Sequence, residues 1–263
     1  MSKQPAPQHP DQQPKPYDAW MAITGDEDET PLTLLDHLNE LRSRLVHALA
    51  ALVIGVLLAV AFTERLLKYL IKPYGTELQV LGPTESVVIY FRVALLAGAI
   101  FAMPYITLQL FLFIAPGLTR KEKRWIYLAL PATTGLFLVG VAFAWFIMVP
   151  AALGFLQDFQ SEIFRAEWTA DRYIAFLTSI LFWIGVAFEL PVVVFVLARL
   201  GIMGPGPLIR NWRLAVVLMT IVAALITPTV DPFNMLLVIA PLIVLYLISI
   251  GLATIAYPRA LRK

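Results

Sequence analysis

The sequence predicts an all-α polytopic membrane protein with six transmembrane helices. Of its 263 residues, 59% are hydrophobic and only 14% are charged, whereas soluble domains carry about 25% charged residues. Long uncharged apolar stretches recur and are separated by short charged segments, which is the pattern of successive membrane spans. Lys and Arg are distributed unevenly between alternate loops, which predicts that both ends of the chain lie on the inner side.

The first 29 residues differ from the rest of the chain. Residues 1–29 are rich in Gln and Pro, contain few aliphatic side chains and end in an acidic run. Such a segment buries too little apolar surface to fold, and it lacks the apolar stretch of a signal peptide. We therefore predict a disordered cytoplasmic tail over residues 1–29 and a six-helix transmembrane domain over residues 30–263.

Span one follows an amphipathic helix. Leucines recur at spacings of four, three and four over residues 34–45, which predicts a helix that leads into span one at residues 45–63. Residues 64–85 form an outer loop with a short interfacial helix. Span two covers about residues 87–115 and ends at Pro116.

Four further spans follow, and the fifth is unusually short. The expected segments are a basic loop at 118–124, span three at 125–149 ending at Pro150, a polar loop at 157–172, span four at 173–198, a loop at 199–213, span five at 214–228 and span six at 233–256. The uncharged stretch 214–230 has 17 residues, roughly 25 Å of helix, whereas the hydrocarbon core is about 30 Å thick. The turn to span six is also very short, so we expect spans five and six to form a tight antiparallel hairpin that barely spans the membrane.

The orientation follows from the Lys and Arg residues near the span ends. With the N-terminus inside, the inner segments carry 14 Lys and Arg residues and the outer segments carry 6. Lys3 and Lys15 are distant from any span, and without them the inner count is still 12 against 6. An even number of spans then places the C-terminus inside as well.

Glu189 is the only charged residue between Arg172 and Arg199, deep in span four. An ionisable group at this depth costs several kcal/mol unless it is neutralised or paired. Pro191 frees the carbonyl of Ala187 one turn earlier, so polar atoms gather here. One interpretation is a polar contact point for a partner helix or a proton. The other is a protonated carboxyl group bonded to backbone atoms within the bundle.

Two acids lie near the predicted inner surface. Glu40 is on the amphipathic helix, and Glu122 is the only acid in the basic loop. Glu40 has a structural interpretation as an i,i+4 pair with Arg44, worth about 0.3–0.5 kcal/mol, and Glu122 has one as a solvated loop charge. Alternatively, each carboxylate binds a guanidinium group through two parallel hydrogen bonds. The spacing does not show that they converge.

Other residues exclude several functions. Asp231, at the last outer turn, is expected to cap span six. The chain has no cysteine, no Gly-rich phosphate loop and no Ser/His/Asp set, and its three histidines lack metal-ligand spacing. The formal net charge of +2 is too small to indicate nucleic acid as a partner. We therefore expect no cofactor, no metal and no enzymatic activity.

Four short strings occur in order along the chain. They are residues 37–45 before span one, residues 113–118 with Glu122 after span two, Phe188-Glu189-Leu190-Pro191 in span four, and Thr227-Pro228 with Asp231-Pro232 at the last outer turn. Each string is weak alone, but the ordered set resembles the TatC family, the multi-spanning receptor subunit of the twin-arginine protein translocase. The resemblance covers nearly the whole chain past residue 30.

The resemblance implies a fold and a set of site residues. It implies a concave bundle with short spans five and six, with Glu189 on the concave face. The implied roles are signal-peptide binding for Glu40, Arg42, Phe113 and Glu122, an intramembrane polar or partner contact for Glu189, Thr227 and Asp231, and structural roles for Pro73, Pro116 and Pro191. Some relatives have Gln where this chain has Met235, and the neighbouring Asn234 is the polar residue here.

The resemblance also implies a function and partners. Such a protein binds twin-arginine signal peptides of folded cargo in the bacterial inner (plasma) membrane, with both termini cytoplasmic. It recruits small single-span partners of the TatA/TatB type, assembles with copies of itself and uses the proton gradient. The alternative is a proton-coupled small-solute transporter that uses Glu189. A transporter would be expected to show internal repeats, broken helices and more than one intramembrane polar ligand.

Overall fold

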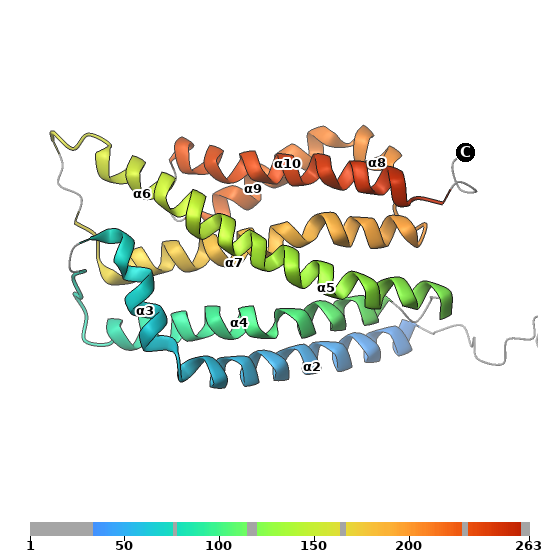
Figure 1. The fold of residues 1–263 in the computed structure, drawn as a ribbon, viewed down its shortest axis with the longest axis horizontal. Coiled ribbons are helices and arrows are strands. Elements are labelled where there is room, and N and C mark those ends of the chain that lie inside the picture. The colour runs from blue at the N-terminus through green and yellow to red at the C-terminus, as the bar shows by residue number, and fades with distance from the viewer. Residues whose placement is uncertain (1–33, 76–77, 115–119, 164–166, 228–230, 259–263) are drawn as a thin grey trace, which may run out of the picture. The chain divides into compact units, whose positions relative to one another are not determined.

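The computed structural model describes residues 34–75, 78–114, 120–163, 167–227 and 231–258. Residues 1–40 and 41–263 form two separate compact units, and the packing described below is that of the second. The predicted tail 1–29 lies outside the described residues. In chain order the helices are α2 (Leu34–Val60), α3 (Thr63–Ile71), η1 (Lys72–Tyr74), α4 (Glu85–Ile114), α5 (Arg120–Phe143), η3 (Ala144–Met148), α6 (Val149–Asp158), α7 (Ala170–Arg199), α8 (Pro205–Arg210), α9 (Trp212–Ile226) and α10 (Pro232–Ala256) (Figure 1).

The predicted all-α, six-span fold is confirmed. In the described part of the chain, five helical segments are long and apolar enough to cross a membrane: His37–Val60, Glu85–Ile114, Ala129–Asp158, Ala170–Arg199 and Pro232–Ala256. The sixth, α9, has 15 residues, which is about 23 Å of helix. Span five is therefore as short as expected, and α9 packs against α10. The expectation that span six is also short was wrong, because α10 has 25 residues and is long enough to cross a membrane.

Span three is longer than predicted, because Pro150 does not end it. Helices α5, η3 and α6 run without a break to Asp158. A proline ring clashes with the carbonyl four residues earlier in a regular helix. Pro150 lies in the first turn of α6, directly after the π-helix η3, and the wider π turn accommodates the ring.

The predicted loops are also shorter than expected. The basic loop 118–124 is partly helical, since α5 begins at Arg120. Lys, Arg and Glu are good helix formers, so the helix continues past its apolar part. The loop 199–213 contains the short helix α8.

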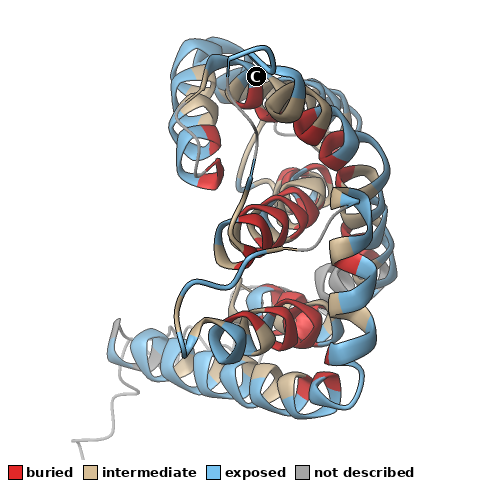
Figure 2. Ribbon diagram, turned by 90° about the vertical axis from the view of Figure 1, so that its left-hand side faces the viewer, coloured by how far each residue is buried: buried red, intermediate tan, exposed pale blue. Residues whose placement is uncertain are grey.

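Helix α7 is the centre of the second unit. It packs against α4, α5 and α10, and Figure 1 shows it between them. Its most deeply buried large side chains recur at helical spacing and include Tyr173, Ile174, Leu177, Ile180 and Ile184. Figure 2 shows buried residues on the central helices, whereas α2, at the bottom of the view, is mostly exposed. Because protein covers α7 on several sides, it can hold a polar side chain away from lipid.

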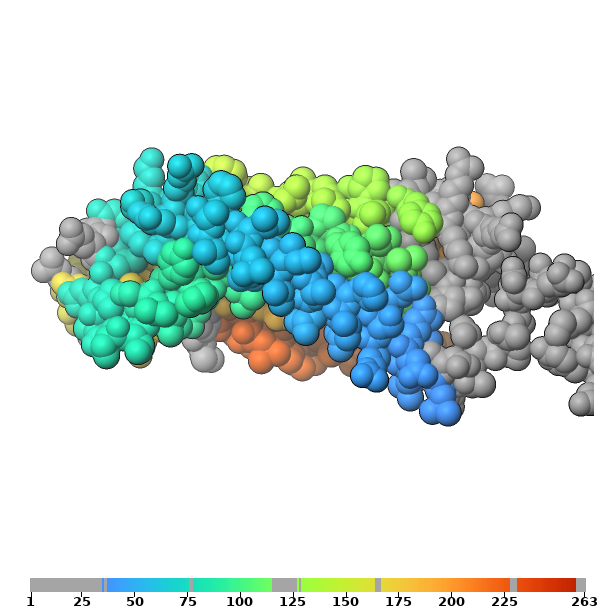
Figure 3. Space-filling view, turned by 90° about the horizontal axis from the view of Figure 1, so that it is seen from below, coloured from blue at the N-terminus to red at the C-terminus, as the bar shows by residue number. Residues whose placement is uncertain are grey.

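Two pairs of helices approach closely at glycines. Helix α2 crosses α4 at Gly55 and Gly98, where a Cβ added to Gly98 would lie 2.5 Å from a backbone nitrogen of α2. Helix α5 crosses α7 at Gly140 and Gly185, where a Cβ on Gly140 would lie 2.7 Å from the Cβ of Phe188. Small residues at such crossings let membrane helices pack closely. Figure 3 shows α2 running diagonally across α4.

The segment after span one covers the start of α7. The short helix predicted there is present as α3, and Pro73 lies exposed at the start of η1. The hydroxyl of Tyr173 donates to the carbonyl of Leu70 at 3.0 Å. The backbone N–H of Trp168 donates to the hydroxyl of Tyr74 at 3.0 Å. These bonds fix the N-terminal end of α7 against α3 and η1.

Candidate functional site

Glu189 is buried in the middle of the helix bundle. It is 5% exposed and lies about 15 Å along the helix from Arg199, the last residue of α7. The hydroxyl of Thr107 on α4 lies 3.2 and 3.1 Å from its two carboxyl oxygens. The deep position predicted for Glu189 is confirmed, and the carboxyl group contacts a side chain of another span.

The hydroxyl of Thr107 does not saturate this carboxyl group. A threonine hydroxyl has one hydrogen to donate, whereas a carboxylate has about four acceptor positions. Pro191, which is buried in α7, has no N–H for the carbonyl of Ala187. A buried acceptor without a partner costs about 1–3 kcal/mol. The carboxyl group of Glu189 can therefore accept further hydrogen bonds.

Thr227 and Asp231 border the turn between α9 and α10. The hydroxyl of Thr227 donates to the carbonyl of Ala223 at 2.8 Å, at the end of α9. Asp231 is the N-cap of α10, and its carboxylate accepts from the backbone N–H and the side-chain amide of Asn234 at 2.7 and 2.8 Å. The predicted capping role of Asp231 is confirmed.

Asn234 adds a buried acceptor to this turn. It is 1% exposed, and its Oδ1 has no hydrogen-bond partner in the described part of the chain. Buried side-chain acceptors are usually bonded in native proteins. The α9–α10 hairpin therefore presents an acceptor at the first turn of α10.

The residues assigned to the inner surface are only partly described. Arg42 is exposed on α2, and Phe113 is half-buried near the end of α4. Glu40 is half-buried and belongs to the first compact unit. The side chain of Glu122 and all of Pro116 lie outside the described residues. The convergence of the two acids on one ligand therefore stays a prediction.

The contact between Arg44 and Gln109 was not predicted from the sequence. Nη1 of Arg44 donates to Oε1 of Gln109 at 3.3 Å and links α2 to α4. Thr107, the partner of Glu189, was not predicted either. Gln109 and Thr107 are buried polar residues in a mostly apolar 30-residue helix. Two such residues within one turn are a sequence signal that the helix meets polar groups on its neighbours.

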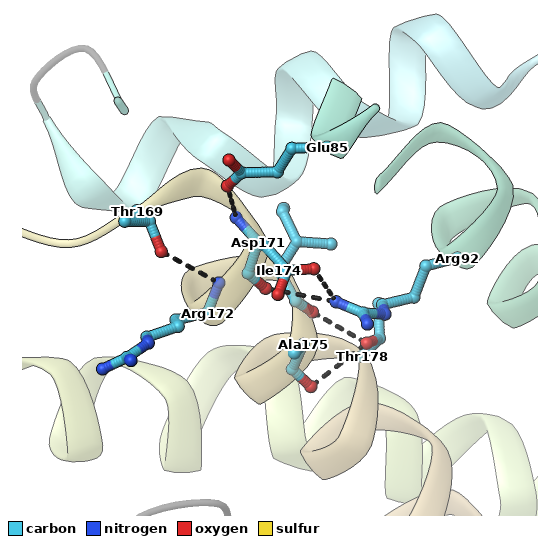
Figure 4. A network of polar contacts seen from close by, with 8 residues as sticks. All are labelled: Glu85, Arg92, Thr169, Asp171, Arg172, Ile174, Ala175 and Thr178. Carbon is cyan, nitrogen blue, oxygen red and sulfur yellow. Dashed lines mark hydrogen bonds and ion pairs between the residues drawn. The ribbon is translucent and has the colours of Figure 1, made fainter. Parts of the chain in front are cut away.

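A polar network joins the N-terminal ends of α4 and α7 (Figure 4). Nη1 of Arg92 donates to Oδ1 of Asp171 at 2.6 Å and to its backbone carbonyl at 3.2 Å. Glu85 accepts from the backbone N–H of Asp171 at 2.9 Å and from those of Leu81 and Gly82 at 2.7 and 3.1 Å. Arg92 lies within the span helix α4, and the ion pair with Asp171 offsets its charge there.

The chain is similar to known proteins along most of its length. Residues 36–241 match the family described as Sec-independent protein translocase protein (TatC). The Sec-independent protein translocase protein TatCd of Bacillus subtilis (strain 168) is 34% identical over 236 residues, which cover 90% of this chain and 97% of that protein. The TatC protein of Koribacter versatilis (strain Ellin345) is 34% identical over 241 residues, with coverages of 88% and 89%. A crystal structure of the twin-arginine translocase receptor TatC superposes with a TM-score of 0.76 at 35% identity, covering 84% of this chain and 99% of that one.

Proposed function

The chain belongs to the TatC family of Sec-independent protein translocase proteins, and on this premise we propose that it binds twin-arginine signal peptides of folded proteins. The match over nearly the whole membrane domain carries this proposal, because the similar solved structure is that of a twin-arginine translocase receptor. The family is one of translocase receptors and not of enzymes. That assignment leaves the small-solute transporter without support.

The ligand's arginines bind carboxylates at the inner membrane surface. Glu40 and Glu122 each accept a guanidinium group through a pair of hydrogen bonds, a geometry that lysine cannot reproduce. The neighbouring Lys and Arg residues at 120, 121, 123 and 124 repel a cationic peptide. The two acids therefore discriminate between ligands, and we assign Arg42 and Phe113 to the same proposed site.

The apolar part of the bound peptide, or a partner helix, then reaches Glu189. The remaining acceptor capacity of that carboxyl group, beside Thr107, supports this step. Small single-span partners of the TatA/TatB type dock a polar group at the α9–α10 hairpin near Thr227, Asp231 and Asn234, where the buried Oδ1 of Asn234 accepts it. The receptor works as a homo-oligomer, and transport uses the proton gradient.

The protein lies in the bacterial inner membrane with both termini in the cytoplasm. The excess of Lys and Arg in the segments assigned to the inside, 14 against 6, supports this orientation. It places Glu40 and Glu122 on the side where folded cargo is made.

Photo-crosslinking of a twin-arginine signal peptide to the purified full-length protein tests the proposal. Glu40→Ala and Glu122→Ala should each weaken peptide binding about tenfold or more, since a hydrogen bond to a charged group contributes about 1.5–3 kcal/mol. A peptide with Lys-Lys in place of Arg-Arg should bind as poorly to the unchanged protein.

Glu64→Ala is the matched control. Glu64 is an exposed carboxylate on α3 that pairs with Lys68 at 2.6 Å, and its removal should leave crosslinking unchanged. Unchanged crosslinking in both the Glu40 and the Glu122 variant would refute the assigned binding site.

A further inference from the structure

A cavity of about 400 Å³ lies between α2, α4 and α7. Its lining includes Leu52 of α2, Arg92, Leu95 and Ala99 of α4, and Ser179 and Trp183 of α7. Neither Glu189 nor Thr107 lines it. The cavity is therefore separate from the intramembrane carboxyl site described above.

The cavity is a groove that follows both helices. Its lining positions run from Arg92 to Ala99 on α4 and from Ala175 to Trp183 on α7 at intervals of one or three residues, which is one face of each helix. From Arg92 to Ala99 the helix rises about 10 Å, roughly a third of the hydrocarbon core. The groove thus begins near the N-terminal ends of α4 and α7 and stops part-way across the membrane.

A guanidinium group lies at the mouth of this apolar groove. Asp171 holds Arg92 through Nη1 (Figure 4), and the Arg92 side chain remains 33% exposed. A guanidinium group has five N–H donors. The contacts of Arg92 within the described residues use Nη1 alone, so Nε and Nη2 keep three donors for an oxygen-rich anion. Because Asp171 offsets the positive charge of Arg92, the groove recognises an anion through the hydrogen-bond donors Nε and Nη2 more than through net charge.

The shape and chemistry of the groove select its occupant. A transmembrane helix is about 10 Å wide and needs the full depth of about 30 Å, whereas this groove ends after a third of that depth. Apart from Arg92, Thr178 and Ser179, the lining residues are leucine, alanine and aromatic side chains, and such apolar walls hold water poorly. A lipid acyl chain is narrow and apolar, and its phosphate lies at the membrane interface, where the mouth of the groove opens.

We propose that this groove binds one phospholipid from the leaflet at the N-terminal ends of α4 and α7. The phosphate accepts hydrogen bonds from Nε and Nη2 of Arg92, and one acyl chain lies along Leu95, Ala99 and Ser179. Through its contact with Leu52, the lipid fills the space between α2, α4 and α7 and holds α2 in place. This inference does not depend on the signal-peptide site.

Native mass spectrometry of the full-length protein, after removal of loosely bound lipid with detergent, tests the proposal. The unchanged protein should retain about one phospholipid per chain. Ser179→Trp, which fills the groove without touching the ion pair, should reduce retention about tenfold. Val139→Trp on α5, at an exposed position away from the groove, should retain lipid normally. Equal retention by these two variants would overturn the proposal.

Titration with defined lipids tests the headgroup contact. Phosphatidylethanolamine and phosphatidylglycerol should bind comparably, and diacylglycerol, which has no phosphate, about tenfold more weakly. Arg92→Gln should remove this difference; if Arg92→Gln does not fold, the three lipids still give the comparison on the unchanged protein. Equal binding of diacylglycerol would refute the phosphate contact. A photo-reactive residue at position 179 should yield adducts of lipid mass in native membranes. Adducts of protein mass would show that a polypeptide occupies the groove and would refute the proposed lipid.

Discussion

Gly98→Ala should loosen the packing of α2 on α4. A Cβ at this position would lie 2.5 Å from the backbone nitrogen of Val56 and 2.6 Å from its Cα. Backbone atoms cannot rotate away as a side chain can, so the two helices must separate. Overpacking of this kind lowers the free energy of unfolding by about 1–3 kcal/mol. The higher helix propensity of alanine offsets about 1 kcal/mol of this loss.

Gly251→Ala on α10 isolates the packing effect. A Cβ added to Gly251 has nothing within 4 Å, so this variant changes only the helix propensity. The difference between the two variants should therefore equal the overpacking cost of about 1–3 kcal/mol. At about 2–4 °C per kcal/mol for a chain of this size, Gly98→Ala should unfold at least a few degrees below Gly251→Ala.

Thermal unfolding in detergent, followed by circular dichroism, measures this difference. Identical midpoints for the two alanine variants would show that α2 does not rest on α4 at Gly98, and the reasoning from the close approach would fail.

Three further predictions concern the polar residues. Thr107→Val should lower the unfolding midpoint and cargo export, because a buried carboxyl group without its partner costs about 1–3 kcal/mol. Thr107→Ser keeps the hydroxyl and should preserve both. Equal behaviour of the two variants would show that the hydroxyl contributes nothing. Glu189→Gln should preserve folding but impair export in a cell-based cargo assay, and normal export would show that ionisation is not needed. Asp231→Ala should destabilise the protein by about 0.5–2 kcal/mol through loss of the α10 cap, while Asp231→Asn should keep most of that stability in the same unfolding assay; an equally large loss for asparagine would contradict the cap as the cause.

The sequence predicted the features that depend on a few neighbouring residues. Hydropathy predicted the helix that leads into span one, and the length of the uncharged stretch predicted the short span five. A cap by Asp231 was expected from its place at the turn before span six. Each of these features is present. The end of span three was predicted wrongly at Pro150, because proline preference alone does not reveal that the preceding turn widens into the π-helix η3.

The candidate site was predictable only in part. Glu189 was identifiable because a single acid in a long apolar span is rare. Its partner was not, since the polar residues of α4 do not specify which helix they face. The approach of Glu40 and Glu122 remains a prediction.

The sequence by itself determined six spans, a short α9, a lone intramembrane acid and a capped last turn, because hydropathy, charge and capping act over one or two helical turns. Only the tertiary structure decided that Thr107 meets Glu189, 82 residues away, and that Arg92 meets Asp171, 79 residues away. It also decided that Gly98 of α4 packs directly against the backbone of α2. These contacts depend on the rotation and crossing of whole helices, which are set by the packing of many side chains together and leave no local pattern in the chain.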